Sequence, residues 1–181
     1  MSLARVTGAA SFAAEAHAGQ MRKGGGRPYI NHPLEVAAAV AEDGADADIV
    51  CAALLHDVVE DTDVAAPEIA ARFGDRVAAL VDELTDRPEW EALPTPDRKA
   101  RQAEEFRSAS AAARQVKIAD QWSNVAELAA VETGHDAGWL AAYLRAARAT
   151  VAVCRPASPG LAARFDGAAE KLERKIGGMG Q

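Results

Sequence analysis

The sequence predicts an all-α fold, and three observations support this prediction. Apolar residues make up 49% of the 181 residues, many of them alanine, whereas aromatic residues make up only 5%. This composition favours closely packed helices over a sheet sandwich, which is rich in β-branched and aromatic residues. Helix caps and helix-ending glycines recur along the chain, and no alternating strand pattern outlasts four residues. We expect one domain over residues 1–181, a bundle of about eight helices, because a chain of this length buries most of its apolar surface in one core.

The first half of the chain is predicted to form helices over residues 11–17, 31–44, 46–61, 66–74 and 75–85. The expected N-caps are Ser11, Asn31 or His32, Asp46 or Asp48, and Asp75. Gly74 is expected to end the fourth helix, since glycine readily takes the backbone conformation that follows a helix. The segment over 46–61 is apolar on nearly all sides, so we expect its helix to be buried at the centre of the fold.

The second half of the chain begins with an irregular connection. Residues 86–97 include three prolines in twelve residues, and the charged segment over 98–107 that follows is expected to form a helix exposed on one side. Apolar residues at helical spacing predict long buried helices over 109–130 and 139–154. A last helix over 161–176 precedes a tail over 177–181 that we expect to be flexible.

Charge and cysteine content limit the partners and the compartment of the protein. The net charge is −7 and the pI is near 5.1, so neither nucleic acid nor an anionic membrane is an expected partner. The two cysteines, Cys51 and Cys154, lie in apolar runs without metal-ligand spacing, which indicates buried free thiols in a reducing compartment. Glu15 and His17 interrupt the N-terminal apolar stretch, and no segment reaches the roughly 20 apolar residues of a membrane span. We expect a cytoplasmic protein.

The stretch LLHDVVED, residues 54–61, places four ionisable side chains among aliphatic ones. On a continuous helix, Asp57 lies one turn before Glu60 and Asp61, so the three carboxylates share a face beside His56. Such carboxylates repel one another. Burying one isolated carboxylate costs on the order of several kcal/mol of free energy unless a cation or hydrogen-bond donors compensate its charge. A divalent metal ion would compensate all of them.

The alternative is that Glu60 and Asp61 form a solvated helix end and that His56 is a hydrogen-bonded core histidine. Acids at a helix C-terminus face the negative end of the helix dipole, which is unfavourable by roughly 0.3–1 kcal/mol each. Further candidate ligands also exist: His32, at the start of a helix, and Asp120, on an apolar helix face. Two imidazoles and two carboxylates with open positions suit manganese or iron(II) better than a closed structural zinc site.

Four segments in this order resemble the HD-domain (p)ppGpp hydrolases: AHAGQMRKGGGRPYINHPLEVA, AALLHDVVEDT, FGDRVAALVDELTD and VKIADQWSN. The resemblance covers about residues 9–155. Within it the chain is similar both to the hydrolase half of the Rel/SpoT proteins and to the small stand-alone alarmone hydrolases of the Mesh1 type. It implies a helical HD-domain fold around one metal site, without a synthetase domain.

The resemblance also implies the chemistry of the site. One Mn²⁺ per chain, or another divalent metal, would be held by His32, His56, Asp57 and Asp120, and the pair Glu60 and Asp61 would act on the attacking water. The implied substrate is a guanine nucleotide, ppGpp or pppGpp, which loses pyrophosphate from its 3′ position to give GDP or GTP. Which of the two acids is the base stays open.

The expected substrate contacts are Arg22, Lys23, Asn124 and Tyr143. Arg22 and Lys23, with Arg27 across a triple-glycine turn, form the densest basic cluster of an acidic protein, and the family uses the Arg-Lys pair against the guanine base. The alternative is an ordinary solvated loop. Asn124 follows Asp120 by one turn and so faces the same site.

Two residues depart from the family pattern. Gln121 stands where the family usually has a lysine or arginine, and Ser123 stands where it has an aromatic residue. The loss of a positive charge weakens attraction for a highly phosphorylated ligand, so two other functions stay open. One is hydrolysis of another phosphorylated nucleotide such as NADPH, and the other is a non-catalytic nucleotide-binding module. No oligomeric state is predicted.

Overall fold

The computed structural model of the protein describes residues 3–22, 26–87, 90, 92–93 and 101–179. Most of the described residues are helical, with nine α-helices named below, and the β-type pairing found among them is one isolated bridge between Met21 and Pro28. The predicted all-α fold is confirmed.

The helices follow one another with short connections. They are α1 (Leu3–Ala16), α2 (Asn31–Glu42), α3 (Ala47–Leu55), α4 (Val58–Asp61), α5 (Ala66–Phe73), α6 (Asp75–Leu84), α8 (Ala111–Ala130), α9 (Ala137–Cys154) and α10 (Pro159–Gly178), with a short 3-10 helix η2 (Arg155–Ala157) before α10. Residues 101–105 are also helical, within the charged segment where a helix was predicted. The predicted helix was to reach residue 107, but residues 106–107 form a turn, while residues 98–100 and most of the proline-rich connection lie outside the described residues.

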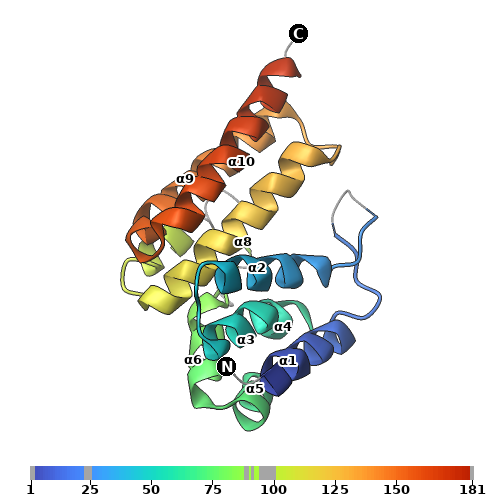
Figure 1. Ribbon diagram of the computed structural model, residues 1–181. Helices are drawn as coiled ribbons and strands as arrows, with labels where there is room; N and C mark the ends of the chain where they lie inside the picture. Colours follow the sequence, from blue (N-terminus) through green and yellow to red (C-terminus); the bar gives the residue numbers. More distant parts are fainter. Residues whose placement is uncertain (1–2, 23–25, 88–89, 91, 94–100, 180–181) are drawn as a thin grey trace.

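Helix α8 connects the two halves of the fold (Figure 1). It packs along α10 and α9 on one side and against α2 and α3 on the other. Helix α3 in turn contacts α1, α2 and α6, and its six residues from Val50 to Leu55 are all buried. One apolar core therefore runs from α1 to α10, as expected for a single hydrophobic centre.

The starts of the first two helices differ from the prediction. Helix α1 begins at Leu3, and Ser11 lies inside it. Helix α2 has Ile30 at its N-cap position without a side-chain cap. The turn over 28–31 explains this, because the carbonyls of Pro28 and Tyr29 already accept hydrogen bonds from the first two backbone N–H groups of α2.

The predicted continuous helix over 46–61 is wrong at one point. Asp46 caps α3, its side chain accepting from the N–H groups of Asp48 and Ile49, but the helix stops at Leu55 and restarts as the single turn α4. At the break, the His56 ring bonds to the carbonyl oxygen of Ala53, 2.8 Å away, in competition with the regular helix ladder. The break lies before Asp57, which occupies the N-cap position of α4, and the N–H of Asp61 donates to the Asp57 carbonyl at 2.8 Å, so these two acids stay one turn apart.

The remaining boundaries agree with the prediction to within a few residues. Gly74 ends α5 with a φ of 92°, and it also occupies the N-cap position of α6, so Asp75 lies in the first turn of α6 without capping it. Helices α8, α9 and α10 are capped by Ser110, Asp136 and Ser158. Helix α10 continues through Gly178, so the first two residues of the predicted flexible tail are helical, while 180–181 lie outside the described residues.

The prediction that both cysteines are buried free thiols is confirmed in the described part of the chain. Cys51 and Cys154 are buried free thiols, and burial raises the pKa of the Cys154 thiol to about 11. Among the helices that the structure describes, none combines the length and the apolar character needed to span a bilayer.

Candidate metal centre

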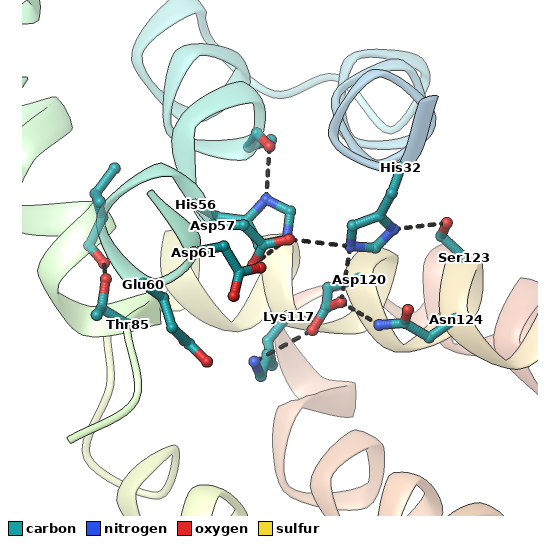
Figure 2. Close-up of polar contacts among 12 residues, drawn as sticks. His32, His56, Asp57, Glu60, Asp61, Thr85, Lys117, Asp120, Ser123 and Asn124 are labelled. Atoms are coloured by element: carbon teal, nitrogen blue, oxygen red, sulfur yellow. Dashed lines mark hydrogen bonds and ion pairs between the residues drawn. The ribbon is translucent and has the colours of Figure 1, made fainter. Parts of the chain in front are cut away.

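Two histidines and an aspartate gather where α2 meets the break between α3 and α4 (Figure 2). Each of His32, His56 and Asp57 offers one ligand atom, and these atoms all lie within 4.8 Å of one another. His32 Nε2 is 3.5 Å from Asp57 Oδ2, and His56 Nε2 is 3.2 Å from Asp57 Oδ1. Both imidazoles are buried, and the Asp57 carboxylate is partly buried.

The hydrogen bonds of His56 determine which ring nitrogen is free. Its Nδ1 lies 2.8 Å from the carbonyl oxygen of Ala53, and a carbonyl oxygen can only accept, so we assign the ring proton to Nδ1. In the neutral ring, Nε2 then has a lone pair that faces the Asp57 carboxylate. His56 Nε2 is buried and makes no hydrogen bond. A lone pair facing a carboxylate fits a cation between them.

Asp120, on α8, lies next to this group from the other side. Its Oδ1 is 3.3 Å from His32 Nε2 and accepts a hydrogen bond from Asn124, at 2.6 Å. Its Oδ2 accepts from Gln121 at 2.9 Å and pairs with the ammonium of Lys117 at 3.2 Å. The structure thus brings all four predicted ligands together, with Asp120 at the edge of the compact group of three.

The two aspartates stay ionised in this environment. Burial by itself would raise the pKa of Asp120, but the ammonium of Lys117, and His32 and His56 when their rings are protonated, lower it well below its usual range. The same opposition operates at Asp57, where burial is outweighed by His56 and His32 when protonated, together with the hydrogen bond from Tyr29, and the net pKa is lowered. Two imidazole nitrogens and two carboxylates that keep their charge form a donor set that could hold a divalent metal ion.

Asp61 is connected to Asp57 through a residue that the sequence did not indicate. The hydroxyl of Tyr29 lies 2.6 Å from Asp57 Oδ2 and 2.8 Å from Asp61 Oδ2. Burial and the two carboxylates raise the pKa of the Tyr29 phenol, so it keeps its proton. Tyr29 therefore fixes the distance between the candidate metal group and the candidate catalytic acid.

Glu60 points to a different neighbour. Its Oε2 accepts a hydrogen bond of 3.2 Å from the backbone N–H of Asp86, at the end of α6. The side chain reaches solvent, yet the surrounding protein and the Asp86 carboxylate raise its pKa. Glu60 and Asp61 are adjacent in sequence (Figure 2), but of the two only Asp61 is linked to Asp57 through the Tyr29 hydroxyl.

Arg22 and Asn124, two of the predicted substrate contacts, lie beside the site and bind each other. Arg22 Nη2 donates to Asn124 Oδ1 at 3.0 Å, and its guanidinium also forms an ion pair with Glu127. Burial opposes the charge of Arg22, but the bond to Glu127 outweighs it and the net pKa is raised. Lys23 lies outside the described residues.

Tyr143, the fourth predicted contact, belongs to a row of aromatic rings at the start of α9. Its ring stacks on Trp139 with centroids 5.2 Å apart, and Trp139 stacks on His135 at 3.6 Å. A role of Tyr143 toward a nucleotide stays a prediction.

Comparison with known proteins identifies the family. The family model described as HD domain matches residues 9–149, most of the chain. The chain belongs to the HD domain family.

Relatives of this HD domain include named hydrolases. The chain is 44% identical over 128 residues to the guanosine-3′,5′-bis(diphosphate) 3′-pyrophosphohydrolase MESH1 of Mus musculus. The match covers 69% of this chain and 70% of the mouse protein. The Homo sapiens protein of the same name gives the same identity and coverage. A solved structure described as "A metazoan ortholog of SpoT hydrolyzes ppGpp and plays a role in starvation responses" superposes with a TM-score of 0.86 at 30% identity, over 97% of this chain and 98% of that one.

Two residues of this HD domain were not singled out from the sequence. Lys117 could have been found, because it precedes Asp120 by three residues and so lies on the same helix face. Tyr29 could not, because it reaches Asp57 and Asp61 across 28 and 32 residues of chain.

Proposed function

We propose that this protein is a metal-dependent guanosine-3′,5′-bis(diphosphate) 3′-pyrophosphohydrolase that converts ppGpp or pppGpp to GDP or GTP and pyrophosphate. The observation that carries the proposal is the buried group of His32, His56 and Asp57, with Asp120 beside it. Its support is the similarity to the pyrophosphohydrolases MESH1 of mouse and human. We assign this function to a single HD hydrolase domain over residues 1–181, in the cytoplasm.

We assign the metal ligands to His32, His56, Asp57 and Asp120, and the metal to Mn²⁺. A divalent cation bound there would supply positive charge to the phosphate oxygens and make a neighbouring water more acidic. The mixed nitrogen and oxygen donor set suits manganese better than structural zinc.

The carboxylates of α4 are proposed to handle the proton of the attacking water. The pKa of Glu60 is raised above its usual value, which suits a general base, while the Asp61 carboxylate lies within hydrogen-bond distance of the Tyr29 hydroxyl. The water oxygen bonds to the phosphorus that is attached to the ribose 3′ oxygen, and the bond between that phosphorus and the 3′ oxygen breaks. Glu60 takes one proton of the water and releases it to solvent, and the 3′ oxygen takes up a proton from solvent as pyrophosphate leaves.

The substrate contacts are proposed on the side of α8 that faces the N-terminal loop. Arg22 and Asn124 bind each other there, so Asn124 fixes the guanidinium beside the metal ligands. Lys23 and Tyr143 are proposed contacts of the same nucleotide. Gln121 removes a charge that the family usually carries, but Lys117 supplies an ammonium to the same oxygen of Asp120 that Gln121 binds.

Product analysis tests the proposal. Metal-free protein is given Mn²⁺ and ppGpp, with NADPH in a parallel reaction and with the Asp57→Asn variant as the control for contaminating phosphatase. Release of GDP and pyrophosphate that requires both Mn²⁺ and Asp57 is the expected result. Release of phosphate from NADPH without turnover of ppGpp would contradict it and favour the other phosphorylated nucleotide. No product from either substrate, with nucleotide still bound, would favour a binding module.

A further inference from the structure

A chain of side-chain hydrogen bonds extends from His32 away from the candidate metal centre. His32 Nδ1 lies 3.0 Å from Ser123 Oγ, on the side of the ring opposite to Asp57 and Asp120 (Figure 2). Ser123 Oγ in turn lies 2.9 Å from Oε2 of Glu35. His32 and Ser123 are 2% and 1% exposed, so water does not compete for the bond between them.

The number of available protons determines which group donates in each of these hydrogen bonds. The Glu35 carboxylate can only accept, so the single O–H of Ser123 is donated to Glu35. With its proton used, Ser123 Oγ can only accept from His32, which requires the proton on Nδ1. In the neutral ring, Nε2 then carries the lone pair, and Nε2 is the atom that faces Asp57 and Asp120.

Glu35 is itself held in place by Arg27. The guanidinium of Arg27 donates to Oε1 of Glu35 at 2.9 Å, which leaves Oε2 for Ser123. Both of these side chains are partly exposed, at 47% and 37%, so the chain of bonds begins at the surface and ends at a buried imidazole.

The two histidines of the site are therefore oriented by different devices. His56 donates to a backbone carbonyl, that of Ala53, which no side-chain substitution removes. His32 depends on the side chain of Ser123.

We propose that Glu35 and Ser123 are positioning residues that fix the Nδ1–H form of His32 and so present its Nε2 lone pair to the divalent cation. The inference rests on the proposed metal-dependent function. Without Ser123, the nearest acceptors for a ring proton are the carboxylates beside Nε2, at 3.3 and 3.5 Å. A proton on Nε2 blocks the lone pair that the cation needs, so the affinity for the cation falls.

The first measurement is the affinity of metal-free protein for Mn²⁺, obtained from the free-ion signal in electron paramagnetic resonance. Ser123→Ala is expected to bind Mn²⁺ about 10-fold or more weakly than the wild type, the size usual for losing an outer hydrogen bond of a metal ligand. Glu35→Gln is expected to bind more weakly than the wild type too, because its amide can donate to Ser123 and reverse the direction of the bonds. Ser158→Ala is the matched control: it removes another buried serine hydroxyl, the cap of α10, and leaves Mn²⁺ affinity unchanged.

The second measurement separates positioning from packing. Nitrogen-15 NMR of the metal-free protein identifies the protonated ring nitrogen of His32, with His56 as the internal reference. The expected result is a protonated Nδ1 in the wild type and a protonated Nε2 in Ser123→Ala, with His56 unchanged in both.

Three outcomes are decisive. Mn²⁺ affinity of Ser123→Ala equal to that of the wild type overturns the proposal. Weaker binding while Nδ1 stays protonated also overturns it, since Ser123 would then act only by packing. A wild type that binds no divalent cation but has Nδ1 protonated rejects the proposed metal-dependent function and supports the positioning of His32.

Discussion

The ammonium nitrogen of Lys117 lies 3.2 Å from Oδ2 of Asp120, and both side chains are buried on α8. Burial opposes the charge of Lys117, yet Asp120, Asp86 and Glu60 raise its pKa above the usual lysine value, so the pair is charged. A buried charge that loses its partner is strongly destabilising, whereas the removal of both charges together is often neutral. Asp120 therefore has a structural role as well as its proposed role as a metal ligand.

Asp120→Ala is predicted to remove Mn²⁺ binding and also to lower the free energy of unfolding by about 3–5 kcal/mol, because Lys117 is left buried without its nearest partner. Asp57→Asn is predicted to remove Mn²⁺ binding with a smaller loss in the free energy of unfolding. The side chain of residue 57 is partly exposed, and the amide oxygen of the variant can still accept a hydrogen bond from Tyr29. Urea denaturation of the metal-free variants measures both costs.

The double variant Lys117→Met, Asp120→Ala is the control for this explanation. It should recover most of the lost stability and still bind no Mn²⁺. A double variant as unstable as Asp120→Ala would show that Lys117 is not the cause.

Glu60→Gln is predicted to lower kcat by about 10²- to 10⁴-fold, the usual contribution of a general base. The variant keeps an oxygen that can accept from the N–H of Asp86, so the fold and Mn²⁺ affinity should not change. Asp61→Asn is measured in parallel. If Asp61→Asn abolishes turnover while Glu60→Gln does not, Asp61 is the base.

The raised pKa of Glu60 also predicts a dependence of stability on pH. Burial and Asp86 raise this pKa above the reference value of 4.5, so the contribution of Glu60 to stability is fully present below 4.5 and is lost as pH rises through the folded pKa. Relative to the wild type, Glu60→Gln should therefore gain stability between pH 4.5 and neutral pH. The gain is small because the side chain reaches solvent. A difference in urea midpoint that does not change with pH would contradict this.

Tyr29→Phe is predicted to destabilise the metal-free protein by about 1.5–3 kcal/mol, because Asp57 and Asp61 lose a shared hydrogen bond to charged groups. It should also lower kcat more than it changes KM, since Asp61 is no longer held toward Asp57. Denaturation and steady-state kinetics measure the two effects. Wild-type stability in the metal-free variant would rule out this hydroxyl as a structural link.

An absorbance measurement tests the environment of Tyr29 directly. Its pKa is raised from 10.0 by burial and by the two carboxylates, so the folded protein should show no phenolate from Tyr29 slightly above pH 10.0. Tyr29→Phe should then leave the phenolate absorbance of the folded protein unchanged and lower that of the unfolded protein at the same pH.

Substitutions of Arg22 and Glu127 are predicted to have different effects on KM for ppGpp. Arg22→Ala should raise KM about tenfold, the general size of a lost charged contact of about 1.4 kcal/mol. Glu127→Gln weakens the ion pair that holds the guanidinium inside the protein and should lower KM or leave it unchanged. Steady-state kinetics on both variants decides this, and a rise in KM for Glu127→Gln would mean that the ion pair positions Arg22 for the substrate.

Several elements followed from short-range patterns in the chain. The cap Asp46, the helix end at Gly74 and the long helix over 111–130 depend on residues within one or two turns, so the sequence was sufficient to predict them. The break at His56 was missed, because the hydrogen bond of its ring to the carbonyl of Ala53 competes with a helix that the apolar pattern favours.

The sequence by itself determined the helical class, the buried segment before His56, and the four acids and imidazoles that resembled a metal site. Only the tertiary structure decided how these groups are connected: Tyr29 between Asp57 and Asp61, and Ser123 behind His32 across 91 residues of chain. The physical reason is the distance along the sequence between the interacting residues. Helical periodicity and capping are set by neighbouring residues, whereas a hydrogen bond between elements depends on the angle and depth at which their helices pack, and the whole core sets that geometry.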